Sequence, residues 1–66
     1  MKPGDVALII PSIALKNMQL DSLVGYTGIV MEICGTMNNI KGCWIRFPVK
    51  YLNEYEWYIP YNSIGL

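Results

Sequence analysis

Turn-forming residues divide this chain into short apolar segments, and this feature limits the folds open to it more than any other. Glycine, proline and asparagine favour tight turns, and β-branched or aromatic runs between them favour strands. The pattern predicts five short strands, at residues 6–10, 29–36, 40–47, 55–59 and 64–66. Residues 60–63 predict a single helical turn before the last strand. We therefore expect an all-β domain.

The segment 12–24 follows neither the strand period nor the helix period. We expect a long loop or a short helix there, because a connection of this length in so small a domain is usually functional or packed on itself. Its apolar residues would line one side of the segment: Ile13, Leu15, Met18 and Leu20. That side either folds down over the sheet or forms one wall of a binding groove.

The hairpin formed by the second and third strands has a register that hydrophobicity favours. A turn centred on Asn38 places Glu32 opposite Trp44 and Val30 opposite Arg46. The other face is then wholly apolar: Ile29, Met31 and Ile33 opposite Phe47, Ile45 and Cys43. A shift by one residue would mix polar and apolar side chains on both faces. The favoured register directs Cys43 inward and Cys34 outward, so we expect two reduced cysteines and no disulfide.

Size and composition exclude several classes of protein. The chain has 66 residues, of which 53% are hydrophobic and 15% charged, and its formal net charge is zero. It is one domain, 1–66, too apolar to be disordered and too neutral to be a general polyanion binder. No apolar run approaches the length of a membrane span. We expect no membrane insertion.

Catalytic and metal-binding chemistry has little support in the sequence. The chain has no histidine and two cysteines, which removes the usual general base and leaves too few ligands for a structural zinc site. Glu54 and Glu56 are more simply explained as a solvated strand edge than as a pair of catalytic acids. We therefore expect no enzymatic activity, no metal and no cofactor. Reduced thiols suit the cytoplasm, which is the predicted compartment.

Aromatic residues gather in the last third of the chain: Trp44, Phe47, Tyr51, Tyr55, Trp57, Tyr58 and Tyr61. A core this small cannot hold them all, and we expect Phe47 and Trp57 inside it. Aromatic rings with one polar end are favoured at protein interfaces. We predict a partner-binding patch made by Trp44, Tyr58, Pro60 and Tyr61 together with Leu15 and Met18. Its occupant would be another protein or a second copy of the chain.

The order of the predicted elements resembles that of SH3-like barrels. Lys2-Pro3-Gly4-Asp5 looks like the opening turn of bacterial members, and residues 11–24 stand where that fold has its long first loop. Residues 41–46 look like the third strand, which in peptide-binding SH3 domains begins with tryptophan, and residues 59–64 look like the proline-led helical turn before the last strand. The resemblance implies a closed five-stranded barrel. Chains of this kind also occur among small phage and mobile-element proteins.

A second resemblance is local. Gly25-Tyr26-Thr27-Gly28-Ile29-Val30 is similar to the G-x-x-G-x-V core of KOW motifs, which occur in ribosomal and transcription-elongation proteins. It implies an alternative function, the binding of RNA or DNA through the basic positions Lys41, Arg46 and Lys50. Nearby glutamates offset these cations. Zero net charge therefore favours the protein-binding interpretation over this alternative.

Overall fold

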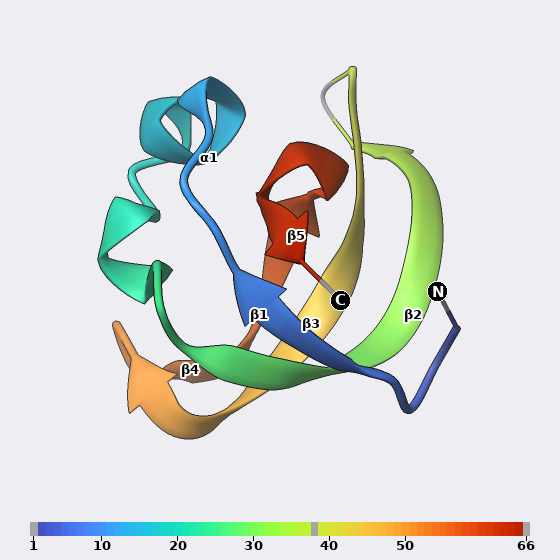
Figure 1. Cartoon of the computed structure of the whole chain (residues 1–66), viewed down its shortest axis with the longest axis vertical. Helices are drawn as coiled ribbons and strands as arrows, with labels where there is room; N and C mark the ends of the chain where they lie inside the picture. Colours follow the sequence, from blue (N-terminus) through green and yellow to red (C-terminus); the bar gives the residue numbers. More distant parts are fainter. Residues whose placement is uncertain (1, 38, 66) are drawn as a thin grey trace.

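The chain forms a single antiparallel sheet of five strands that curls into a half-barrel (Figure 1). A computed structural model describes residues 2–37 and 39–65, with only the backbone described at 33–37. The strands are β1 (Val6–Ile9), β2 (Thr27–Met37), β3 (Ile40–Tyr51), β4 (Glu54–Pro60) and β5 (Ile64–Gly65). Their order across the sheet is β4-β3-β2-β1-β5. The all-β prediction is confirmed.

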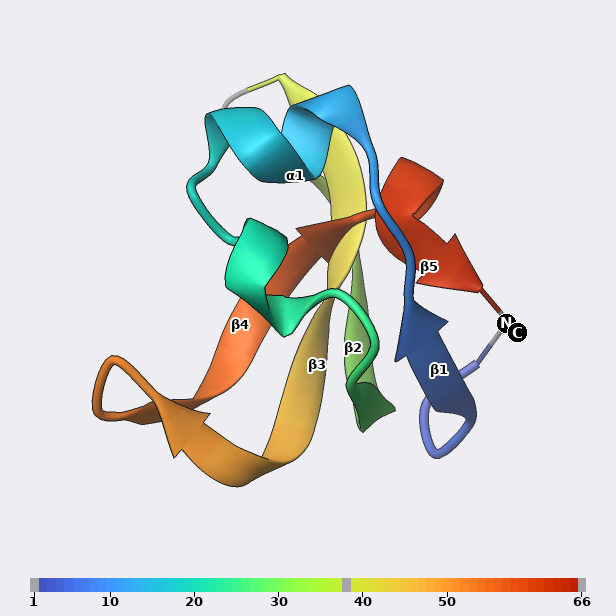
Figure 2. The same ribbon diagram turned by 60° about the vertical axis from the view of Figure 1, so that its left-hand side comes forward.

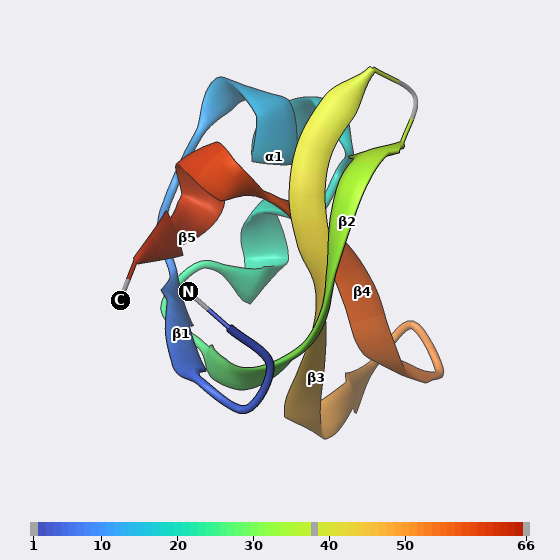
Figure 3. The same cartoon turned by 90° about the vertical axis from the view of Figure 1, so that its right-hand side faces the viewer.

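The connection between β1 and β2 is partly helical. It contains α1 (Ile13–Asn17) and the 3-10 helix η1 (Asp21–Leu23), which lie between β1 and β4 on the inner side of the curl (Figures 1 and 3). Ser12 starts α1, because its hydroxyl accepts a hydrogen bond from the Leu15 amide at 3.1 Å. The predicted helical turn is the 3-10 helix η2 (Tyr61–Ser63), which leads into β5.

The core fills the concave side of the sheet. Alternation along β1 buries Ala7 and Ile9, and alternation along β3 buries Cys43, Ile45 and Phe47. The remaining buried hydrophobic residues of the core cluster are Leu15, Leu20, Leu23, Val30 and Ile59. Phe47 is therefore in the core as predicted, whereas Trp57 is partly buried and packs against it.

The predicted register of the β2–β3 hairpin is correct in its middle and wrong on both sides of it. Next to the turn, a register shift pairs Met37 with Ile40, so the turn is not centred on Asn38 as predicted. Ile33 pairs with Cys43 and Glu32 with Trp44, as expected. Met31 then bulges out of the pairing, so Val30 meets Ile45. Val30 is 1% exposed, whereas Ile29 and Met31, which were predicted to face the core, are 40% and 42% exposed.

Backbone bonds from the opening turn hold Val30 in this shifted position. The Val30 N–H donates to the Asp5 carbonyl at 2.8 Å, and the Gly4 N–H donates to the Val30 carbonyl at 2.7 Å. A bulge increases the local bend of a strand, and here it lets β2 turn from β3 toward β1. The outward placement of Cys34 lies outside the described side chains.

Two smaller expectations are also corrected. β3 continues through Pro48 to Tyr51 rather than ending at residue 47, with a register shift between Arg46 and Tyr51 that accommodates the missing N–H of proline. Ile13 is 80% exposed, because it occupies the solvent side of the first turn of α1. Within the described residues, no helix has the length and apolar character needed to cross a membrane.

Candidate binding surface

The edge strand β4 lies next to the α1–η1 connection (Figure 2). An apolar groove lies along this strand. Its volume is about 410 Å³. It is lined by Met18, Leu20, Trp44, Glu54, Glu56, Trp57 and Tyr58. We call this surface the Trp44 groove. Its walls come from two parts of the chain that are far apart in sequence, the connection after β1 and the β3–β4 hairpin.

Strand alternation places Trp44 outside the core. Its neighbours Cys43 and Ile45 are buried on the inner face, so the indole of Trp44 projects from the other face and is half-buried. Tyr58 is its cross-strand partner on β4. The two rings meet edge to face, with centroids 5.7 Å apart and an interplanar angle of 69°. Trp44 therefore covers Tyr58, which is 3% exposed.

The polar ends of the other two aromatic walls are held by the backbone. The Trp57 indole N–H donates to the carbonyls of Tyr51 and Glu54, each at 3.2 Å, which fastens the β3–β4 turn. The Tyr58 hydroxyl donates to the Ile40 carbonyl at 2.7 Å. Within the described part of the chain, Trp44 has the ring contact with Tyr58 but no hydrogen bond from its indole N–H. Among the aromatic residues that line the groove, Trp44 is thus the one whose donor has no partner in the described part of the chain.

Carboxylates surround Trp44. Glu54 and Glu56 line the groove, and Glu32 is the cross-strand neighbour of Trp44 on β2. Arg46 pairs with Glu56 at 3.1 Å, and both side chains are about half exposed. An ion pair in that setting adds little to stability. The groove therefore combines an apolar floor with an acidic rim.

The structure brings together three of the six residues predicted to form a partner-binding patch. Met18, Trp44 and Tyr58 share the Trp44 groove. Leu15 and Pro60 are fully buried, so their side chains offer a partner almost no surface. Tyr61 is half-buried and lines a separate hollow beside Pro60 and Lys41.

Four residues of the Trp44 groove were not in the predicted patch. Leu20 was recognised as part of the apolar side of the 12–24 segment, but nothing in the sequence places that side against β4. Trp57 was expected wholly inside the core, although one part of it lines the groove. Glu54 and Glu56 were interpreted as a solvated edge, which describes their exposure but not their position beside Trp44.

The three basic residues of the nucleic-acid alternative do not all come together. The Arg46 guanidinium lies 4.9 Å from the centre of the Tyr55 ring and the Lys50 ammonium 5.5 Å from it, so two of the cations converge on one aromatic side chain. Lys41 lines the hollow beside Tyr61 instead. The cluster is small, and Glu56 already engages Arg46.

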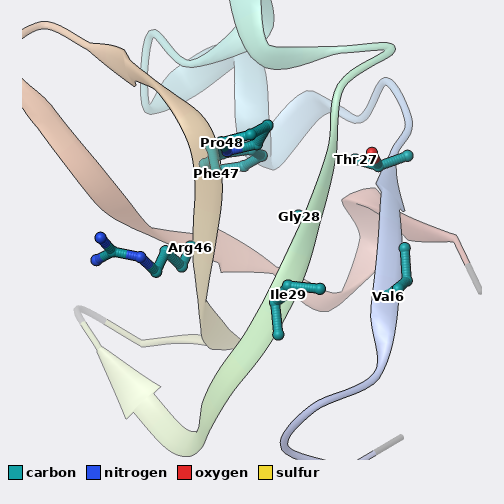
Figure 4. Close-up of a pocket in the computed structure, with 7 residues that line it drawn as sticks. All are labelled: Val6, Thr27, Gly28, Ile29, Arg46, Phe47 and Pro48. Atoms are coloured by element: carbon teal, nitrogen blue, oxygen red, sulfur yellow. The ribbon is translucent and has the colours of Figure 1, made fainter.

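A third surface lies where β1, β2 and β3 adjoin (Figure 4). Val6 and Ile29, which are cross-strand partners, contribute to its apolar lining together with Phe47 and Pro48, and the side chain of Arg46 extends away from Val6 and Ile29. Gly28 lies on β2 opposite Ala7 of β1, and a Cβ at this position would overlap Cγ2 of Ile45. Gly25, at the start of the KOW-like segment, has a φ of +93°. The two glycines thus serve a turn and a close strand contact.

Comparison with known proteins gives no match for this chain, whether against protein-family models, curated proteins or solved structures.

Proposed function

We propose that this protein is a small non-enzymatic binding module whose Trp44 groove docks on another protein or on a second copy of the chain. The observation that supports this most directly is the position of Trp44. It is a half-buried indole with no internal hydrogen-bond partner among the described residues, beside an apolar floor made by Met18 and Leu20. Tryptophan in such a setting is the residue type most enriched at interaction hot spots.

We also propose that the curled sheet belongs to the SH3-like barrels. Three features support this: the long connection between β1 and β2, the 3-10 helix η2 directly before β5, and the pairing of β1 with both β2 and β5. In peptide-binding SH3 domains the third strand begins with tryptophan, and Trp44 lies on β3 here. This likeness supports a peptide or protein as the occupant of the groove.

The size of the groove sets the expected strength of binding. Covering a few hundred Å² of apolar surface contributes several kcal/mol at roughly 25 cal/mol per Å², before the cost of association is subtracted. One site of this kind gives modest affinity. Several copies acting together, on a multivalent partner or in an oligomer, would bind much more tightly.

Selection from a random peptide library displayed on phage tests this proposal. Peptides enriched on the wild-type protein should lose binding to the Trp44→Ala variant and keep it on Tyr26→Ala, a matched control that removes an exposed aromatic residue outside the lining of the groove. Peptides that bind both variants equally would contradict the proposal. Sedimentation equilibrium of the wild type at high concentration tests the self-association arm, for which a monodisperse monomer is the contrary result.

The binding of RNA or DNA is the second candidate function. One observation favours it: Arg46 and Lys50 both approach the Tyr55 ring, which combines positive charge with a stacking surface. The glutamate beside Arg46 and the separate position of Lys41 make this cluster weaker than the Trp44 groove as a candidate.

A further inference from the structure

We infer that the occupant of the Trp44 groove is a peptide segment in which lysine or arginine adjoins an apolar side chain. This inference rests on the proposed function and specifies its ligand. The inference is based on the charged side chains around the groove. Three carboxylates, those of Glu32, Glu54 and Glu56, lie around Trp44, and Arg46 is the cation among their cross-strand neighbours.

Arg46 does not cancel this acidic character. Its guanidinium is engaged by Glu56 at 3.1 Å and stands over the Tyr55 ring at 4.9 Å. In the described part of the chain, neither Glu32 nor Glu54 forms a salt bridge. The rim therefore presents two unpaired carboxylates and one that already shares a cation. A partner with positive charge complements this rim, and a partner with negative charge is repelled.

The groove can satisfy both parts of such a segment. The apolar side chain would lie against Met18 and Leu20, and the cation would reach the rim. A cation near an indole face gains attraction from the ring as well as from the carboxylates. Nucleic acid fits this surface poorly, because its phosphates would face Glu32 and Glu54. A second copy fits only if it presents one of the few basic residues of the chain next to an exposed apolar side chain.

The test is a comparison of two selections from one random peptide library. One selection uses the wild-type protein and the other uses the double variant Glu54→Gln/Glu56→Gln, which keeps the size of both side chains and removes their charge. We expect the wild-type pool to be enriched in lysine or arginine next to an apolar residue, and the variant pool to lack this enrichment. If the double variant has the same thermal unfolding temperature as the wild type, its fold is intact.

Binding measurements on the enriched peptides complete the test. Their affinity should fall by about threefold to tenfold on the double variant, as for partly exposed charge pairs, and should weaken as salt is raised. Asp21→Asn is the matched control, because Asp21 is an exposed carboxylate that lines a different hollow, and it should leave affinity unchanged.

Failure of this inference can be distinguished from failure of the proposed function. Peptides that need Trp44 but show no preference for basic residues would overturn the inference and leave the proposed function standing. Peptides indifferent to Trp44→Ala, or no enrichment at all, would overturn both. A basic preference that survives the triple variant Glu32→Gln/Glu54→Gln/Glu56→Gln would also overturn the inference, since the charge would then come from outside the rim.

Discussion

The hydroxyls of Ser12 and Ser63 hydrogen-bond to each other although they are 51 positions apart in the chain. Ser12 caps α1 by accepting from the Leu15 amide, and Ser63 ends η2 and is fully buried. The pair therefore ties the long β1–β2 connection to the turn before β5. Because the α1–η1 connection carries Met18 and Leu20, the same tie helps to fix one wall of the Trp44 groove.

Removing either serine hydroxyl should destabilise the protein, and Ser12→Ala should cost more than Ser63→Ala. Ser12→Ala removes the helix cap and leaves the buried Ser63 hydroxyl without its partner, for a loss of about 2 kcal/mol. Ser63→Ala keeps the cap and should cost about 1 kcal/mol. Urea unfolding followed by circular dichroism measures both losses. Ser22→Ala, at an exposed serine of η1, is the control and should change little, and the reverse order of losses would contradict the assigned roles.

Two glycines at strand contacts should not tolerate a methyl group. A Cβ at Gly28 would overlap Cγ2 of Ile45 and lie 2.9 Å from the Arg46 carbonyl oxygen, and one at Gly42 would overlap the Ile59 carbonyl oxygen. We expect Gly28→Ala and Gly42→Ala each to lower the free energy of unfolding by about 3 kcal/mol.

The control for the glycine variants is Gly65→Ala. A Cβ there would lie 3.4 Å from its nearest atoms, a distance that small movements can accommodate. In the same chemical-unfolding experiment, Gly65→Ala should lower the free energy of unfolding much less than Gly28→Ala or Gly42→Ala. Equal losses at all three positions would show that glycine flexibility, rather than steric contact, decides the effect.

Cys43 should react slowly with a thiol reagent under native conditions, because it is buried. The sequence-based register also predicts a faster reaction at Cys34. Mass spectrometry of the labelled peptides separates the two sites, and labelling after unfolding gives the upper limit. An intact mass that shows a Cys34–Cys43 disulfide would contradict the register prediction.

A labelled single-stranded oligonucleotide tests the second candidate function. We expect no micromolar binding in a titration at low salt, because Glu56 already engages Arg46 and Lys41 lies away from the Arg46–Tyr55–Lys50 cluster. Binding that weakens steeply with salt, and that is lost in Lys50→Gln, would instead support this alternative, because phosphate contacts release counterions. Lys16→Gln, which removes an exposed cation on α1, is the control.

The parts of the fold that follow local rules could be predicted from the sequence. The strand around residues 55–59 was predicted because alternation and the flanking Asn53 and Pro60 are visible in the sequence itself, and η2 was predicted from its proline-led turn. The bulge at Met31 could not be predicted. It depends on the pairing of Val30 with the opening turn, which is a contact between distant parts of the chain.

The residues of the candidate site also differ in whether local sequence patterns or contacts between distant parts of the chain determine their position. Trp44 was identified from its residue type and from alternation along β3, both of which are local. The contribution of Leu20 required knowing that the β1–β2 connection lies beside β4. Leu15 and Pro60 were wrongly placed in the patch. Their burial depends on how α1 and η2 fill the open side of the curl, which no local sequence pattern indicates.

The two tryptophans should respond differently to substitution, although they lie on neighbouring strands. Trp57 packs against the core and its indole N–H donates to two carbonyls, so Trp57→Ala should lower the free energy of unfolding by about 3 kcal/mol or more. Trp44 touches Tyr58 from the outside, so Trp44→Ala should cost less stability. It should nevertheless weaken the binding of a groove-selected peptide by about 2 kcal/mol or more.

Chemical unfolding and peptide titration on both variants separate these effects. Trp44→Phe serves as the conservative control, because it keeps a ring against Tyr58 but removes the indole N–H. If that donor is used by the ligand, Trp44→Phe should fold like the wild type and still bind more weakly. If Trp44→Ala unfolds the protein as severely as Trp57→Ala, then Trp44 is a core residue, and the groove built around it is not a binding surface.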